Sequence, residues 1–317
     1  MSDNEPITIL LPIKNGERFL LNAIKSIEAN ISDIDEVLVI DDGSTDSTSK
    51  LLVRWQTENS RVRTLKGSSS GLVNALNLGL NNASNNWVAR FDVDDSYSTS
   101  RLFEQRKWIN DDIALIFSDY EIKSAGGSEM GTIHGAIFHP AVSLSLITSS
   151  RTPHPGALFN RLVALEVGGY RSEDFPAEDL SLWLRMSRMS RLVSVPMPLL
   201  KYKMHEDSIT SNMGREMRKK TIDLLHFFKI YSRDLVTLEH TWEEIYHNYK
   251  FFSKTSERRI FFLRDLIALS RLHPELTWVR SAKLGIAVRL LLNPYVVFVI
   301  VKMKIEQIRR RVQRKLH

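Results

Sequence analysis

The first 120 residues alternate short apolar runs with stretches of helical period, and this alternation constrains the fold more than any other feature. The apolar runs at residues 7–11, 37–40 and 87–91 have the length and composition of buried strands. The stretch after the first run carries apolar residues three and four positions apart, namely Leu20, Ala23, Ile24 and Ile27. Strands that alternate with helices in this way predict an α/β fold with a Rossmann-like, mostly parallel sheet flanked by helices.

The same pattern continues with weaker signals and then changes. Further strands are predicted at residues 61–66 and 113–117, and further helices at 48–56, 72–80 and 101–109. Residues 126–155 show no clear period, which predicts a variable insertion or a lid. An organised α+β pattern returns at residues 156–205. After residue 211 the chain becomes helical and basic-aromatic, so we expect a domain at 1–211, with halves at about 1–125 and 126–211, and a helical region at 212–317.

Three polar segments follow predicted strands directly. They are Pro12–Asn15, the pair Asp41–Asp42 and the acidic run Asp92–Asp95. Ligands of such sheets bind outside the carboxyl ends of the strands, where the loops and helix N-termini lie. The predicted topology therefore brings the three segments to one crevice.

The acidic run has the chemistry of a site for a divalent cation. In extended backbone Asp92 and Asp94 lie on one face and Asp95 on the other, so the first two carboxylates can converge and Asp95 is expected to be structural. Mg²⁺ and Mn²⁺ prefer such oxygen ligands. The chain has no cysteine, which excludes a thiolate metal site and a cysteine nucleophile. Taken alone, the run is more typical of a solvated acidic loop than of a metal site.

The order of motifs along residues 6–211 resembles glycosyltransferase family 2, whose members have the GT-A fold. The resemblance is carried by ITILLPIKN at 7–15, EVLVIDDGSTDS at 36–47, GLVNALNLGL at 71–80, WVARFDVDD at 87–95, HPG at 154–156, VGGY at 167–170, AEDL at 177–180, LWLR at 182–185 and YKMHEDSIT at 202–210. Two positions depart from the family pattern, since Lys14 replaces a common aromatic residue and Thr99 replaces a usual proline. These departures concern the donor pocket.

The resemblance implies a role for individual residues. Asp42 would contact the nucleotide base, with Pro12 lining the same pocket, and Asp92 would lie near the ribose and diphosphate. Asp94 would be the principal metal ligand, shared with Asp92, and Asp179 the catalytic base. A carboxylate base is needed because an acceptor hydroxyl is a poor nucleophile at neutral pH.

Local structure offers an alternative for several of these side chains. In the pair Asp41–Asp42, Asp41 is the better candidate for a cap on the turn before the next helix. Glu178 and Asp179 together also suit a helix N-terminus, where acids complement the helix dipole.

Four more residues are candidates for supporting the site. Arg90 and Arg101 flank the acidic run and either hold its carboxylates or form surface ion pairs. His205 is a candidate contact of the diphosphate or metal, although a lone histidine is also commonly structural. Glu178 is placed in the same supporting group.

Together these features predict an inverting, Mn²⁺- or Mg²⁺-dependent enzyme that moves a sugar from a nucleotide-diphosphate donor, expected to be a UDP-sugar. The resemblance implies a glycan or lipid-linked oligosaccharide acceptor and a setting in bacterial surface polysaccharide synthesis. A sugar-phosphate nucleotidyltransferase is the enzyme alternative, but it requires a Gly-rich phosphate loop where Pro12–Gly16 has one glycine. A non-catalytic nucleotide-sugar-binding module is the other, and it should lack one of the acids.

The ends of the chain bear on localisation. The polar, acidic segment Met1–Pro6 does not resemble a signal peptide, which together with the absence of cysteine predicts a cytoplasmic protein. Seven basic residues and one acid in 302–317 account for the whole net charge of +6. Pro294 and Arg289 make 284–301 a poor transmembrane segment, so we expect either peripheral attachment to anionic lipid or a buried C-terminal helix. No nucleic-acid recognition motif accompanies the basic tail.

Overall fold

The computed structural model describes residues 5–32, 35–124, 126–137, 139, 142–143, 145–146, 152–204 and 212–227. These residues belong to one compact unit, Met1–Ile230. Most of the helical region predicted at 212–317, including the C-terminal tail, lies outside the described residues. The expected boundary near residue 212 stays a prediction.

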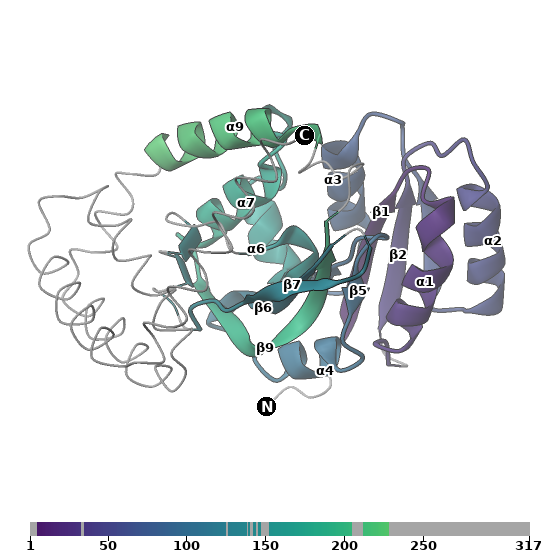
Figure 1. Cartoon of the computed structure of the whole chain (residues 1–317), viewed down its shortest axis with the longest axis horizontal. Helices are drawn as coiled ribbons and strands as arrows, with labels where there is room; N and C mark the ends of the chain where they lie inside the picture. Colours follow the sequence, from purple (N-terminus) through teal and green to yellow (C-terminus); the bar gives the residue numbers. More distant parts are fainter. Residues whose placement is uncertain are drawn as a thin grey trace, which may run out of the picture. The chain divides into compact units, whose positions relative to one another are not determined.

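The strands of the described residues form one nine-stranded sheet in the order β3-β2-β1-β4-β8-β6-β9-β5, with β7 paired to β6 (Figure 1). Their bounds are β1 Ile7–Ile13, β2 Glu36–Asp41, β3 Val62–Lys66, β4 Trp87–Arg90, β5 Ser96–Tyr97, β6 Ile113–Lys123, β7 Glu129–Ile133, β8 Leu158–Asn160 and β9 Arg191–Lys203. The sheet is parallel from β3 to β4. Strand β8 is antiparallel to both of its neighbours, and β6 and β9 run parallel. The sheet is therefore continuous across both predicted halves of the domain.

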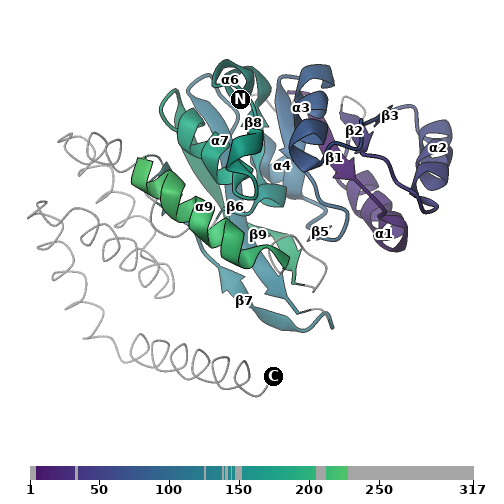
Figure 2. The ribbon, with the colours of Figure 1, turned by 90° about the horizontal axis from the view of Figure 1, so that it is seen from above.

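Helices cover both faces of the parallel part of the sheet. The bounds are α1 Glu17–Glu28, α2 Thr48–Glu58, α3 Leu72–Asn82, α4 Arg101–Arg106, α6 Arg161–Glu166, α7 Glu178–Met186 and α9 Gly214–Phe227. Helices α1 and α3 lie on opposite sides of β1 (Figure 2). The predicted apolar stripe of α1 is confirmed, because Leu20, Ala23 and Ile27 are buried in the core.

A close helix–strand approach explains one glycine of α3. A Cβ atom at Gly79 would lie 2.2 Å from Cδ1 of Leu10 on β1. Because Leu10 is fully buried, the helix can approach the sheet this closely only without a side chain at that position. The N-terminus of α3 is thereby placed at the carboxyl edge of the parallel strands.

Three sequence predictions need correction in their extent. The strand predicted at 113–117 extends to Lys123, and the helix predicted at 101–109 ends at Arg106. Part of the segment expected to lack regular structure forms β7, since β6 offers it a pairing edge. Within the described part of the chain, no helix is both long and apolar enough to cross a membrane.

Candidate active site

A cavity of about 710 Å³ opens at the carboxyl ends of β1, β2 and β4. Its lining includes Pro12, Asp42 and the acidic run except Val93, so the three strand-end segments predicted to meet do meet. The strand order turns back on itself between β1 and β4, and such a switch point leaves a crevice between the loops that follow the two strands. The remaining walls come from α3, α7, β6, β9 and α9.

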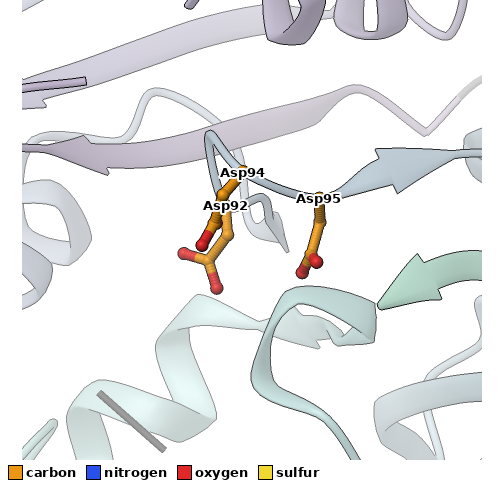
Figure 3. Close-up of side chains that lie close together, drawn as sticks. All are labelled: Asp92, Asp94 and Asp95. Atoms are coloured by element: carbon orange, nitrogen blue, oxygen red, sulfur yellow. The ribbon is translucent and has the colours of Figure 1, made fainter. Parts of the chain in front are cut away.

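The acidic run brings its three carboxylates together. One ligand oxygen from each of Asp92, Asp94 and Asp95 lies within 4.8 Å of the others. Figure 3 shows the three side chains directed to the same side of the backbone. The expectation that Asp95 faces away is wrong, because Val93 and Asp94 form a turn rather than extended backbone. Asp95 is also held in place, since its Oδ1 accepts the backbone N–H of Lys203 at 2.9 Å.

The cluster fits a hard divalent cation. Burial raises the pKa of Asp92 and raises that of Asp95 further, and the neighbouring carboxylates of the run add to both shifts. Three converging carboxylates are the kind of oxygen donor set that Mg²⁺ or Mn²⁺ prefers. Asp95 is a residue that the sequence argument left out of this set.

Arg90 is the cation built into the cluster. Its side chain is 2 % exposed, and its Nη2 lies 2.5 Å from Oδ1 of Asp92. Burial alone would lower the pKa of Arg90, but Asp92 raises it overall. The expected support of the carboxylates is therefore present, and a surface ion pair is excluded because the guanidinium is buried.

Arg101 supports the site indirectly, through hydrogen bonds to the backbone near Arg90. It is fully buried and does not line the cavity. Its Nη2 donates to the backbone oxygens of Arg90 and Ala157 at 3.1 and 3.2 Å, and its guanidinium lies over the ring of Phe91. Its hydrogen bonds go to these backbone oxygens and to Oε1 of Gln105 rather than to the carboxylates, although its charge acts to lower the pKa of Asp92. Because Arg101 is buried, a surface ion pair is excluded.

The two acids after β2 have different roles, as the sequence suggested. Asp41 acts as the cap, since its Oδ1 accepts the backbone N–H of Ser44 at 2.9 Å. In Asp42, Oδ2 accepts the N–H of Gly71 at 2.9 Å, whereas Oδ1 is buried without a partner. Asp42 lines the cavity, so one of its oxygens is fixed and the other is left for a ligand.

The N-terminus of α3 is part of the cavity wall, which sequence reasoning missed. Gly71, Leu72 and Ala75 line the cavity, and Gly71 has a φ of 96°. Only glycine adopts this backbone conformation readily. The signal was present in the sequence, because a glycine stood directly before a predicted helix. A helix N-terminus at this place favours bound phosphate.

Helix α7 directs two acids into the cavity from its first turn. Glu178 is 5 % exposed, and Asp179 is half-buried with its Oδ1 accepting the N–H of Leu180 at 2.7 Å. Burial raises the pKa of Asp179 to about 6 and, with the charge of Asp179, that of Glu178 to about 8. The two acids do lie in the first turn of a helix, as the alternative based on local structure predicted. Both side chains also line the cavity, which a role in binding or catalysis requires.

His154 also lines the cavity and is held by its neighbours. Its Nε2 lies 2.8 Å from the hydroxyl of Tyr170, and burial keeps its pKa well below the usual value. His154 is therefore neutral. His205, the other histidine considered from the sequence, lies outside the described residues.

Part of the cavity wall is apolar. It contains Tyr120 and Ile122 of β6, Tyr202 of β9, Met204, and Met217 of α9. Tyr202 and Met204 belong to the motif quoted at 202–210, but no individual role was predicted for any of the five residues, because nothing local distinguishes them from other apolar side chains. The cavity lining thus combines carboxylates suited to a metal diphosphate with apolar side chains suited to a less polar group.

Sequence comparisons agree with this geometry. Residues 8–161 match the profile described as glycosyl transferase family 2. An uncharacterised glycosyltransferase of Haemophilus influenzae is 28% identical over 229 residues, which are 67% of this chain and 70% of that protein.

Two relatives from Escherichia coli have named activities. A UDP-Gal:α-D-GlcNAc-diphosphoundecaprenol β-1,3-galactosyltransferase is 31% identical over 194 residues, 58% of this chain and 69% of that protein. A UDP-Glc:α-D-GlcNAc-diphosphoundecaprenol β-1,3-glucosyltransferase is 24% identical over 225 residues, 69% of this chain and 85% of that protein. The alignment with an uncharacterised glycosyltransferase of Rickettsia conorii spans only 32% of that longer protein.

Solved structures share the fold. Residues 1–349 of Staphylococcus aureus TarS, in complex with UDP-GlcNAc, superpose with a TM-score of 0.57 at 15% identity, covering 89% of each chain. The mannosyltransferase PcManGT of Pyrobaculum calidifontis, in complex with GDP-Man and Mn²⁺, superposes with a TM-score of 0.53 at 16% identity, covering 92% of this chain and 82% of that one. The mixed sheet with its flanking helices is therefore the predicted GT-A fold, and the chain belongs to glycosyltransferase family 2.

Proposed function

We propose that this chain is an inverting, metal-dependent glycosyltransferase that moves a sugar from a UDP-sugar to a hydroxyl of a lipid-linked glycan. The observation that carries the proposal is the convergence of Asp42, the acidic run and Asp179 on one cavity. A nucleotidyltransferase or a non-catalytic module has no comparable support, since every acid of the family pattern is present.

Different residues of the cavity would bind different parts of the donor. Asp42, with one free oxygen, would bind the nucleotide base beside Pro12. Asp94, with Asp92 and Asp95, would hold Mn²⁺ or Mg²⁺, and Arg90 would keep Asp92 oriented. Such a cation supplies charge neutralisation to the diphosphate as it leaves.

Asp179 would perform the proton transfer. Its carboxylate accepts the proton of the acceptor hydroxyl as that oxygen forms a bond to the anomeric carbon. The bond between the anomeric carbon and the diphosphate oxygen breaks, and its electron pair leaves with the nucleoside diphosphate. A single displacement on the face opposite the leaving group inverts the anomeric configuration.

The acceptor class follows from the apolar wall and from the named relatives. Ile122, Met204 and Met217 suit a substrate with an apolar portion, and the two Escherichia coli relatives are named for transfer to a GlcNAc diphosphate on a polyprenol. We propose the same acceptor class here, at the cytoplasmic face of a membrane and in the synthesis of a bacterial surface polysaccharide.

The test is a transfer assay with a panel of UDP- and GDP-sugars and a synthetic GlcNAc-diphospho-lipid, with Mn²⁺, with Mg²⁺ or with EDTA. We expect metal-dependent transfer from a UDP-hexose and, by NMR, a β-linked product from the α-linked donor. Pyrophosphate release from UTP and a sugar 1-phosphate would instead support a nucleotidyltransferase. Binding of UDP without hydrolysis or transfer from any donor would support a non-catalytic module.

A further inference from the structure

Four buried side-chain atoms without a hydrogen-bond partner belong to residues of the cavity wall. They are Asp42 Oδ1, Arg90 Nε, Glu178 Oε2 and Trp183 Nε1. Buried polar groups are nearly always paired, so four unpaired ones on residues of one cavity wall leave hydrogen-bonding capacity for a ligand or for water. The proposed function uses Asp42 and Arg90 but leaves Glu178 without a role.

The surroundings of Glu178 disfavour its ionised form. It is the first residue of α7, it is 5 % exposed, and its Oε2 has no partner. The groups that act on its charge are Asp179 beside it on α7, Asp92 after β4 and Arg90 on β4. The charge of Glu178 also acts to raise the pKa of Tyr170, which lies on the segment before α7.

Arg90 cannot neutralise Glu178 fully, because its guanidinium is hydrogen-bonded to Asp92. An ionised Glu178 would therefore be a buried carboxylate next to Asp179 and repelled by the charge of Asp92, which is a costly arrangement. Burial and the charge of Asp179 accordingly raise the pKa of Glu178 to about 8, above the value of about 6 for Asp179. At neutral pH the proton of the pair resides on Glu178.

A protonated carboxyl is a hydrogen-bond donor, whereas an ionised one only accepts. The first turn of α7 thus presents two neighbouring side chains of opposite character to the cavity, Glu178 as donor and Asp179 as acceptor. Sugars carry adjacent hydroxyl groups, and each hydroxyl both donates and accepts. Two adjacent hydroxyls match this pair, with one facing each carboxyl group.

We propose that Glu178, in its protonated form, binds the acceptor sugar by donating a hydrogen bond to the hydroxyl oxygen next to the one that Asp179 deprotonates. This inference rests on the proposed function, because it needs Asp179 to face the acceptor. It assigns Glu178 to the acceptor rather than to the diphosphate, which the metal cluster and the N-terminus of α3 serve.

The test compares Glu178→Ala with Glu178→Gln in the transfer assay with UDP-galactose or UDP-glucose, whichever supports turnover, and a GlcNAc-diphospho-lipid. Glu178→Ala should raise the KM for the acceptor about 10- to 100-fold, as expected for a lost hydrogen bond in a buried site. The affinity for UDP with Mn²⁺, measured by calorimetry, should change less than about twofold, because UDP lacks the acceptor contact. Glu178→Gln should recover most of the acceptor affinity, because its amide keeps an N–H donor of similar size.

The pH profile separates the donor role from simple packing. In the wild type the acceptor KM should rise above pH 8, where Glu178 loses its proton, and in Glu178→Gln this rise should be absent. An acceptor KM unchanged in Glu178→Ala would overturn the inference. So would Gln and Ala variants that are equally impaired, or a rise in the donor KM alone.

A substrate-free measurement separates this inference from the proposed function. At neutral pH, the difference spectrum between the wild type and Glu178→Gln should show the infrared carbonyl band of one protonated carboxyl. If Asp179→Asn removes that band and Glu178→Gln does not, the proton resides on Asp179 and the inference fails. Absence of transfer from every donor would overturn the proposed function and the acceptor contact, while the band still reports which carboxyl is protonated.

Discussion

At the scale of single residues, the cavity wall holds more acids than arginines, because Arg90 is the only arginine among its described lining residues. Asp92, Asp95, Glu178 and Asp179 all have raised pKa values, for which burial is the leading cause. Arg90 alone does not balance them. A divalent cation and protonation of one α7 carboxyl are two means by which the charge is relieved.

The first prediction concerns Asp94, the proposed principal metal ligand. Asp94→Ala should weaken Mn²⁺-dependent binding of the UDP-sugar by about 100-fold or more, since metal coordination is worth several kcal/mol. Titration calorimetry with Mn²⁺ and with EDTA measures the effect. The exposed Asp111 provides a matched control, as Asp111→Ala removes the same group far from the run. Normal metal-dependent affinity in Asp94→Ala would contradict the metal assignment.

The second prediction concerns Asp179 as the base. Asp179→Asn keeps the size of the side chain but cannot accept the proton, so kcat should fall by about 10²- to 10⁴-fold. Donor affinity by calorimetry should stay near that of the wild type. A variant that retained most of its kcat would show that another group removes the proton.

The third prediction is the acidic limb of the pH profile. The base works only when ionised, and burial raises the pKa of Asp179 to about 6. The value of kcat/KM should therefore be level between about pH 6 and pH 8 and fall about tenfold for each unit below pH 6. Initial rates between pH 5 and 8 measure the limb. A profile that stayed flat to pH 5 would be inconsistent with this base.

At the scale of elements, two helix starts and three strand ends build the cavity. The side chain of Asn77 connects one of these helices, α3, to the segment before α7. Asn77 of α3 donates through Nδ2 to the backbone oxygen of Tyr170 at 2.8 Å and accepts its N–H at 2.9 Å. Tyr170 in turn contacts His154 in the cavity wall. The position of α3 and the acceptor side of the cavity are thereby linked.

The fourth prediction tests this link. Asn77→Ala leaves both backbone groups of Tyr170 without these partners and should lower the free energy of unfolding by about 1–3 kcal/mol. Asn81, one turn later, is exposed and donates only to the backbone oxygen of Asn77. Asn81→Ala should therefore cost less than about 0.5 kcal/mol. Urea denaturation of both variants makes the comparison, and equal effects would refute the link.

At the scale of the whole molecule, the charge of the chain is concentrated in a segment outside the described residues. The seven basic residues of 302–317 carry the net charge of +6, which leaves the rest of the chain neutral overall. Clustered basic residues are attracted to anionic lipid by about 1 kcal/mol each near the surface. A membrane-bound acceptor would place the enzyme beside such a surface.

The fifth prediction is that deletion after residue 301 reduces co-sedimentation with phosphatidylglycerol vesicles at low salt. The difference from the full chain should disappear on phosphatidylcholine vesicles and at about 0.5 M salt, where charges are screened over a few ångströms. An unchanged pellet fraction on anionic vesicles would argue against lipid binding by the tail.

Local pattern accounts for what the sequence predicted well. Each of these features depends on only a few neighbouring residues: the strand and helix periods, the glycines of turns, and the acids after β2 and β4. The α/β fold and the crevice were therefore predictable. The family order of motifs then selected Asp42, Asp94 and Asp179. Segment 126–155 was less predictable. Strand β7 forms there because it pairs with β6, and its own residues show no clear apolar period.

The sequence by itself determined the alternation of strands and helices, the acids at the strand ends and the family. Only the tertiary structure decided that Asp95 joins the carboxylate cluster, that Arg90 is buried against Asp92, and that Glu178 faces the cavity unpaired. The physical reason is that burial and charge neighbours depend on segments far apart in the chain. Asp92 and Glu178 influence each other across 86 positions of sequence, and no local period contains that distance.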